Sequence, residues 1–299
     1  MEEIKKRQIL KTAMDIFKEK GYFAASMQEI AEACGMAKAS IYKVFPSKED
    51  LFTGVFADVH RTMFEEAREL DRVLRLEGEP PKEILRRKIE FQLQYMLENY
   101  FFTSEFKELP VTENENFQNA WRKKRADLLS WHRDCFREAY GEAVAPYLWD
   151  VVAIFRGMLK EYLSHANQHV IGLPMSELAG FLAGRIDAVV NELLQSKPDP
   201  VLKESGVYFN DINPADFMTK QESLKEFLHS FSRRIAGLQS PEPVRRELLE
   251  VVSLLQQQLD GEESPNPTLV KVYVSYLDSV SDLSPYVRQL NLMLSQMER

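Results

Sequence analysis

Apolar side chains recur along this chain at intervals of three and four residues, the spacing that places them on one face of an α-helix. The first such stretch runs from Ile9 to Phe17, and the spacing returns through most of the sequence. No segment of useful length alternates apolar and polar residues as a half-buried strand would. The pattern therefore predicts an all-α fold. The longer predicted stretches are 47–76, 81–102, 112–140, 144–170, 174–196, 216–237, 241–260, 267–282 and 284–298.

Glycine and proline mark the breaks between these stretches. Both are sparse, with 12 Gly and 14 Pro in 299 residues, and a chain of this length holds about two domains. We expect a three-helix head at 1–46, a larger helical body at 47–196, a linker at 197–215 and an additional C-terminal helical subdomain at 216–299. The apolar stripes of that subdomain must be buried, so we expect it to pack on residues 81–196 or on a second subunit.

Several classes of protein are excluded by what the sequence lacks. No apolar run approaches the roughly 20 residues of a membrane-spanning helix, and the N-terminus has no signal-peptide core. We therefore expect a cytoplasmic protein with no membrane partner. Cys34 and Cys135 form neither a disulfide framework nor a metal-binding spacing. No nucleophile-and-base motif or phosphate loop is present, so we predict neither an enzyme nor a bound cofactor.

Two polar groupings are open to a functional and an ordinary interpretation. Glu161, His165 and His169 lie at i, i+4 and i+8 of one predicted helix, where they could bind a divalent metal. Three such residues on an exposed helix face are ordinary, however, and we predict no metal site. The basic run 122–125 could be a second nucleic-acid patch. Four consecutive helical residues point in all directions, so we interpret it as a solvated basic turn.

The distribution of charge is compatible with a nucleic-acid partner. The net charge of −8 at first discourages one. Residues 1–52, however, carry nine Lys and Arg against eight Asp and Glu, a net of +1, which leaves −9 for the remainder. An acidic body with a near-neutral head can still bind DNA, provided that the cations of the head share one face.

Residues 26–45 have the layout of a helix-turn-helix. Ala31 is the small residue needed where two short helices cross, and Gly35 tolerates positive φ in the turn between them. The inward-facing positions hold Ile30, Cys34, Met36, Ile41 and Val44. The exposed face of the second helix then carries Lys38, Ser40, Tyr42 and Lys43. Such a face fits a major groove, with its cations on phosphates and its short polar groups near base edges.

The segment AKASIYKVFPSKEDLF, residues 37–52, resembles the recognition-helix signature of the TetR family of bacterial transcriptional regulators. The likeness covers about residues 5–56. Over 57–196 it is one of helical architecture, and beyond about residue 200 it lapses. Further matching positions, where the family has its first two helices, are Phe17, Gly21, Ser26, Ile30 and Ala31.

The resemblance implies double-stranded operator DNA as a partner and a role for each matching position. It implies phosphate contacts from Ser26, Tyr42 and Lys48. The residues that would face the groove are Lys38, Ala39, Ser40 and Lys43. Two positions depart from the family pattern. Ala37 stands where a capping Ser is frequent, which costs about 1 kcal/mol, and Ala39 replaces a common Gly.

The body is rich in aromatic residues, and the resemblance implies that some of them line a pocket for a small lipophilic or aromatic effector. Ordinary core packing is the alternative for any single ring. The residues that we predict to line the pocket are Phe91, Tyr95, Phe102, Trp121, Trp131, Phe155 and Tyr162.

We also expect a homodimer, since one short recognition helix reads too few base pairs to select a site. The first candidate interface is the apolar stripe of residues 174–196, unless that stripe is core within the chain. Its members are Leu178, Phe181, Leu182, Ile186, Val189, Val190 and Leu193.

The resemblance thus implies a regulator of transcription, and we predict a repressor that an effector releases from its operator. Two alternatives stay open. One is an activator with the same architecture, and the other is a helical protein–protein interaction module with a vestigial head. Salt-dependent binding to promoter DNA separates the module from a regulator, because a vestigial head would show none.

Overall fold

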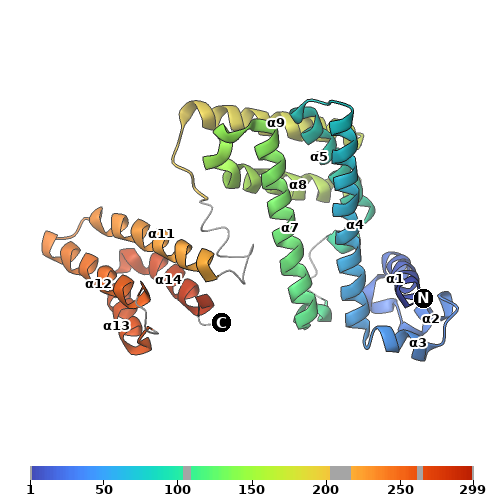
Figure 1. Cartoon of the computed structure of the whole chain (residues 1–299), viewed down its shortest axis with the longest axis horizontal. Coiled ribbons are helices and arrows are strands. Elements are labelled where there is room, and N and C mark those ends of the chain that lie inside the picture. The colour runs from blue at the N-terminus through green and yellow to red at the C-terminus, as the bar shows by residue number, and fades with distance from the viewer. Residues whose placement is uncertain (1, 104–108, 203–216, 261–264, 298–299) are drawn as a thin grey trace. The chain divides into compact units, whose positions relative to one another are not determined.

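A computed structural model describes residues 2–103, 109–202, 217–260 and 265–297 of the chain (Figure 1). In these ranges every regular element is a helix, as the apolar period predicts. The contacts divide the chain into two compact units, Met1–Val201 and Leu202–Arg299. The predicted linker at 197–215 lies largely outside the described residues, which stop at Leu202 and resume at Phe217.

The head consists of α1 (Glu2–Ala24), α2 (Met27–Ala33) and α3 (Lys38–Val44). The helical path of α1 is interrupted at Gly21, whose φ is 79°. In the turn between α2 and α3, Gly35 has a φ of 64°, as the helix-turn-helix layout requires of that position. Ala31 is fully buried where α2 meets its neighbours. The two short helices and the turn between them therefore fall within residues 26–45, where the sequence predicts a helix-turn-helix.

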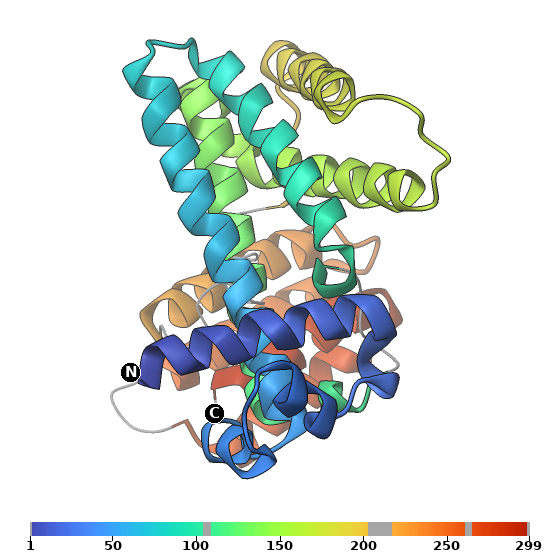
Figure 2. The ribbon, with the colours of Figure 1, turned by 90° about the vertical axis from the view of Figure 1, so that its right-hand side faces the viewer.

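The long helix α4 (Lys48–Leu76) links the head to the body. It begins at an N-cap, because Ser47 Oγ accepts a hydrogen bond of 3.0 Å from the backbone N–H of Asp50. This contact satisfies one of the free donors at the start of the helix. Helix α1 packs across the N-terminal part of α4 (Figure 2). The remainder of α4 runs beside the helices of the body.

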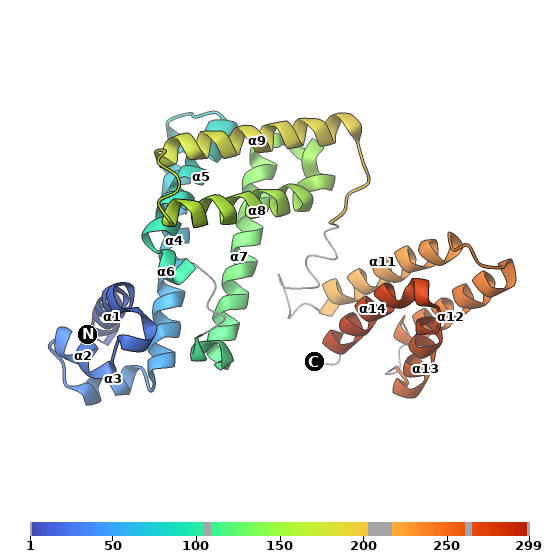
Figure 3. The same ribbon diagram turned by 180° about the vertical axis from the view of Figure 1, so that it is seen from behind.

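The rest of the first unit consists of α5 (Pro81–Glu98), α6 (Tyr100–Thr103), η1 (Pro110–Glu113), α7 (Glu115–Tyr140), η2 (Glu142–Tyr147), α8 (Leu148–Asn167) and α9 (Met175–Ser196). Helix α5 packs against α4, α7, α8 and α9. Helices α8 and α9 lie together and cross α7, as Figure 3 shows. This arrangement encloses the space between α5, α7 and α8.

The apolar stripe of α9 is mostly core within the chain. Helix α9 packs along α5, and this packing covers one side of the stripe. The prediction that the whole stripe forms a dimer interface is therefore wrong for its buried members. The exposed side retains Phe181, 44% exposed, whose ring packs edge-on against Tyr162 at a centroid distance of 5.6 Å. The buried members are Leu178, Leu182, Ile186 and Val190.

The second unit consists of α11 (Phe217–Ala236), α12 (Glu242–Asp260), α13 (Pro267–Asp278), η4 (Ser281–Leu283) and α14 (Ser284–Met297). Its helices bury their apolar stripes against one another. Phe231 of α11 and Tyr286 of α14 stack with a centroid distance of 5.6 Å and an interplanar angle of 4°. We expected cover from the body or from a second subunit, whereas these stripes form a core within their own unit.

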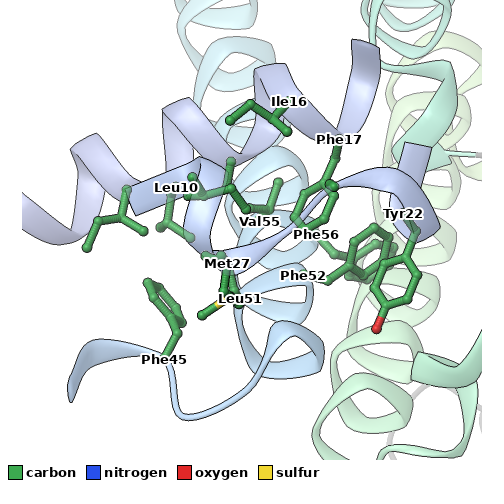
Figure 4. Close-up of a cluster of buried hydrophobic side chains, with 14 of the residues drawn as sticks. Leu10, Ile16, Phe17, Tyr22, Met27, Phe45, Leu51, Phe52, Val55 and Phe56 are labelled. Carbon is green, nitrogen blue, oxygen red and sulfur yellow. The ribbon is translucent and has the colours of Figure 1, made fainter. Parts of the chain in front are cut away.

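One hydrophobic cluster joins the head to the near end of the body. Phe52 of α4 packs edge-on against Phe17 and Tyr22 of α1, at 5.3 Å and 5.2 Å (Figure 4). On its other side Phe52 contacts Phe102 of α6 at 5.6 Å and Phe117 of α7 at 6.0 Å. The head and the near end of the body therefore share a continuous core through α4.

Candidate functional site

Helix α3 presents a polar face to solvent. Of its seven residues, Ile41 is completely buried and holds the helix on the head. Five others are exposed: Lys38, Ala39, Ser40, Tyr42 and Lys43. All five of the α3 residues that the sequence analysis assigned to DNA are thus exposed to solvent.

Ser26 and Ala37 stand at the starts of the two short helices. Ser26 Oγ accepts a hydrogen bond of 3.1 Å from the backbone N–H of Glu29, while Ser26 itself is exposed. A hydroxyl that accepts a hydrogen bond can still donate its own proton, so Ser26 can also donate to a phosphate. Ala37 supplies no side-chain cap to α3. The sequence analysis predicts this, because Ala37 stands where the family frequently has a capping Ser.

Lys48 is less accessible than the lysines of α3. Its Nζ lies 3.3 Å from the backbone oxygen of Phe23 and 4.6 Å from the ring centroid of Tyr22. Burial lowers the pKa of its ammonium group. An ammonium group has three N–H donors. The carbonyl of Phe23 accepts one of them, and a phosphate contact from Lys48 would use the other two.

The body contains a cavity of about 540 Å³ between α5, α6, α7 and α8. Its size falls within the range of small-molecule sites, about 300–1,000 Å³. The residues that line it are Gln92, Met96, Tyr100, Thr103, Trp121, Lys124, Arg125, Leu128, His132, Arg156, Leu159, Lys160, Leu163 and Ser164.

One of the seven aromatic residues predicted to line a pocket, Trp121, lines this cavity. The others fill space between helices. Phe102 is fully buried in the core shared with the head, and Tyr95 donates a hydrogen bond of 2.7 Å to the backbone oxygen of Val59. The remaining four pack in aromatic pairs, Phe91 with Tyr95, Trp131 with Phe64, Phe155 with His132 and Phe136, and Tyr162 with Phe181.

The basic run 122–125 is not the uniformly solvated turn that we expected. Lys124 is only 8% exposed, and its Nζ lies 4.5 Å from the ring centroid of Trp121 and 5.4 Å from that of Phe56. Burial, together with the nearby Arg156 guanidinium, lowers the pKa of Lys124 to about 7. Lys123, in contrast, is exposed and pairs with Asp127 at 3.1 Å. The sequence carried a signal for this difference, because Trp121 and Leu128 flank Lys124 at i−3 and i+4 on an apolar face.

Two further polar residues face the cavity from deep positions. His132 Nε2 and Gln92 Oε1 are 3.0 Å apart, and both residues are buried. Burial and the Arg156 guanidinium lower the pKa of His132 to about 3. His132 is therefore neutral near pH 7, and it donates to Gln92 through Nε2–H.

The helical spacing assumed for a metal site does not hold. Helix α8 ends at Asn167, and His169 lies beyond it with a φ of 58°. His165 instead turns toward its own helix, with Nδ1 2.9 Å from the backbone oxygen of Glu161.

Within the described ranges, no helix is both long and apolar enough to cross a membrane.

Known proteins resemble the head and, separately, the whole chain. A family model described as bacterial regulatory proteins, tetR family, matches residues 9–55. The uncharacterized HTH-type transcriptional regulator YuxN of Bacillus subtilis (strain 168) is 26% identical over 98% of this chain and 98% of its own length. A second regulator of that organism, YerO, is 24% identical over 98% of this chain and 97% of its own. A solved structure from Mesorhizobium loti, assigned to the same family, matches with a TM-score of 0.51 and 20% identity over 62% of this chain and 95% of that one.

Proposed function

We infer from these matches that the chain is a member of the TetR family of bacterial transcriptional regulators. We propose that it is a repressor whose release from operator DNA follows the entry of a small effector into the cavity of the body. The observation that carries the DNA-binding part is the exposed face of α3. It places two lysines, a serine and a tyrosine on one surface of a helix that a single buried residue anchors.

Each residue of this face has a role that fits its chemistry. The hydroxyls of Tyr42 and Ser26 supply donors for phosphate oxygens, which position the head on the duplex. Lys38, Ser40 and Lys43 stand where side chains reach base edges in the major groove. Lys48 adds a phosphate contact from the start of α4.

We propose that two copies act together. A helix of seven residues reads few base pairs, and paired heads that reach successive major grooves about 34 Å apart multiply the selectivity. The exposed side of α9 around Phe181, together with Tyr162 of α8, is the apolar surface that we assign to this dimer. Sedimentation at micromolar concentration tests it, and a monomer would contradict the assignment.

Helix α4 supplies the proposed link between effector and DNA. Its 29 residues make a rod of about 43 Å, with one end in the core of the head and its side against the body. An effector that favours another angle of α4 would change the spacing of the two α3 helices. The shift can be no larger than the difference in effector affinity between the two states.

A reporter experiment tests the direction of regulation. DNA fragments retained by the purified protein are sequenced, and a promoter that contains such a site is fused to a reporter gene. For a repressor, deletion of the regulator raises reporter expression, and a variant with Lys43→Ala fails to lower it again. Expression that falls on deletion would identify an activator instead. Absence of salt-dependent binding to any fragment would refute the DNA-binding role of this face.

A further inference from the structure

The cavity between α5, α7 and α8 concentrates positive charge. Lys124 and Arg156 both line it, and no acidic residue of the described chain does. Arg156 lies close enough to Lys124 and His132 for its guanidinium group to lower the pKa of both. Two neighbouring cations in a partly enclosed space repel each other and lose hydration, which is costly unless an anion completes the site.

The same cavity contains polar atoms without partners. Three buried side-chain atoms among its lining residues find no hydrogen-bond partner in the described part of the chain, namely Gln92 Nε2, His132 Nδ1 and Arg156 Nη1. The Lys124 ammonium rests on the rings of Trp121 and Phe56, and no carboxylate of the described chain pairs with it. Buried polar groups in folded proteins are nearly always hydrogen-bonded, so a cluster of exceptions needs an explanation.

Apolar side chains form the rest of the wall. Aromatic and aliphatic residues from three helices face the same space, and they give the cavity an apolar surface beside its cations. These residues are Met96, Tyr100, Trp121, Leu128, Leu159 and Leu163. A ligand that complements both the cations and the apolar wall of the cavity must carry an anionic group and an apolar body.

We propose that the effector is an organic anion with an apolar body, a carboxylate, sulfonate or phosphate ester, whose charged group binds between Lys124 and Arg156 while Trp121 and the leucines enclose its apolar part. This inference rests on the proposed function, since it names the chemical class of the effector. It adds an anionic group to the small lipophilic or aromatic effector that the sequence analysis predicts. Gln92 Nε2 is the third donor available to the anionic group.

A pair of fluorescent probes tests the charge requirement. 8-Anilinonaphthalene-1-sulfonate and N-phenyl-1-naphthylamine have the same ring systems, and the sulfonate alone carries a negative charge. Each is titrated into the full chain without DNA, and into the variants Lys124→Met, Arg156→Gln and Lys123→Met. Lys123 is the matched control, because it is the neighbouring lysine of the same helix and is exposed. Circular dichroism confirms that each variant is folded.

We expect the sulfonate to bind saturably and more tightly than the neutral probe. Lys124→Met and Arg156→Gln should each weaken the sulfonate by about tenfold or more, because a charge-assisted hydrogen bond is lost. Affinity for the neutral probe should not fall in Lys124→Met, and Lys123→Met should behave as the wild type. Equal affinity for the two probes, no saturable binding, or a sulfonate affinity that changes less than twofold in both cavity variants would overturn the inference.

The outcome is independent of the DNA-binding proposal. Probe binding is measured without DNA, so a failure here leaves the role of α3 intact. Conversely, loss of DNA binding in the Lys43→Ala variant says nothing about the cavity. If the sulfonate binds as expected while no DNA fragment is retained, the anion site stands and the regulatory role falls.

Discussion

The indole ring of Trp121 stacks on the phenyl ring of Phe56, with a centroid distance of 5.8 Å and an interplanar angle of 24°. Trp121 lines the cavity, whereas Phe56 belongs to α4 and to the core shared with the head. One stacked pair therefore connects the wall of the cavity to the helix that carries the head. The proposed effector would therefore act on α4 if it displaced Trp121 or the Lys124 ammonium that rests on its ring.

The same cluster predicts how the first unit unfolds. Phe56 is completely buried, and Phe56→Ala should lower the free energy of unfolding by about 3–5 kcal/mol. The head and the near end of the body share this core. In Phe56→Ala, faster hydrogen exchange in α2 and a change in Trp121 fluorescence should therefore appear under the same conditions. Phe64→Ala is the control, since Phe64 is half-buried and packs on Trp131. Unchanged exchange in α2 of the Phe56 variant would show that the core is not shared.

The exposed face of α3 predicts separable effects on DNA. Tyr42→Ala and Lys43→Ala should weaken operator binding without lowering the thermal midpoint, because both side chains are exposed. Lys48→Ala should reduce the slope of log K against log salt by about one unit, as for one lost phosphate contact. Affinity is measured by fluorescence anisotropy at several salt concentrations. Full affinity and an unchanged slope in all three variants would refute the assignment, and Lys123→Ala serves as a charge control far from α3.

Ala37 offers a stabilising substitution. Its backbone has the extended conformation of an N-cap residue, with φ −66° and ψ 140°, and no side chain caps α3. Ala37→Ser should add a hydrogen bond to a free N–H of the first turn and raise the free energy of unfolding by about 0.5–2 kcal/mol. Urea denaturation measures this gain. Ala37→Val, which adds volume but no acceptor, is the control, and an equal gain from valine would exclude capping as the cause.

The buried ammonium of Lys124 predicts that stability rises with pH. Its pKa falls from 10.5 to about 7 on folding, so between these values the unfolded chain binds more protons and the free energy of unfolding increases as pH rises. Lys124→Met removes this penalty and should stabilise the protein by a few kcal/mol at pH 6. The difference from wild type should shrink toward pH 10.

The charged or titratable neighbours of Lys124 must be considered in that measurement. Arg156 faces it from α8 and His60 from α4, and Arg125 and His132 lie on the same helix. Burial lowers the pKa of His60 and of His132 in the folded protein, whereas both titrate around their ordinary pKa of about 6.5 in the unfolded chain. The wild type and Lys124→Met share these groups, so the difference between their thermal unfolding from pH 6 to pH 9 isolates Lys124. A variant less stable than wild type at pH 6 would contradict the cost that we assign to burying the Lys124 ammonium.

The sequence by itself determined the helices and the head. The apolar period, Gly21 and Gly35 at positive φ and the caps Ser26 and Ser47 act locally, within a turn or two of the chain. Local geometry also fixes which residues of a short helix face outward, so the exposed face of α3 could be predicted.

Tertiary structure decided the cavity and the partners of each buried stripe. An apolar period shows that one side of a helix is covered, but it does not show whether another helix, a second subunit or a ligand covers it. For that reason, Leu182 and Ile186 of α9 proved to be core, and most of the predicted pocket aromatics fill gaps between helices. The accessibility of Lys124 depends on where α4, α5 and α8 pass α7, and residues far apart in sequence set those crossings.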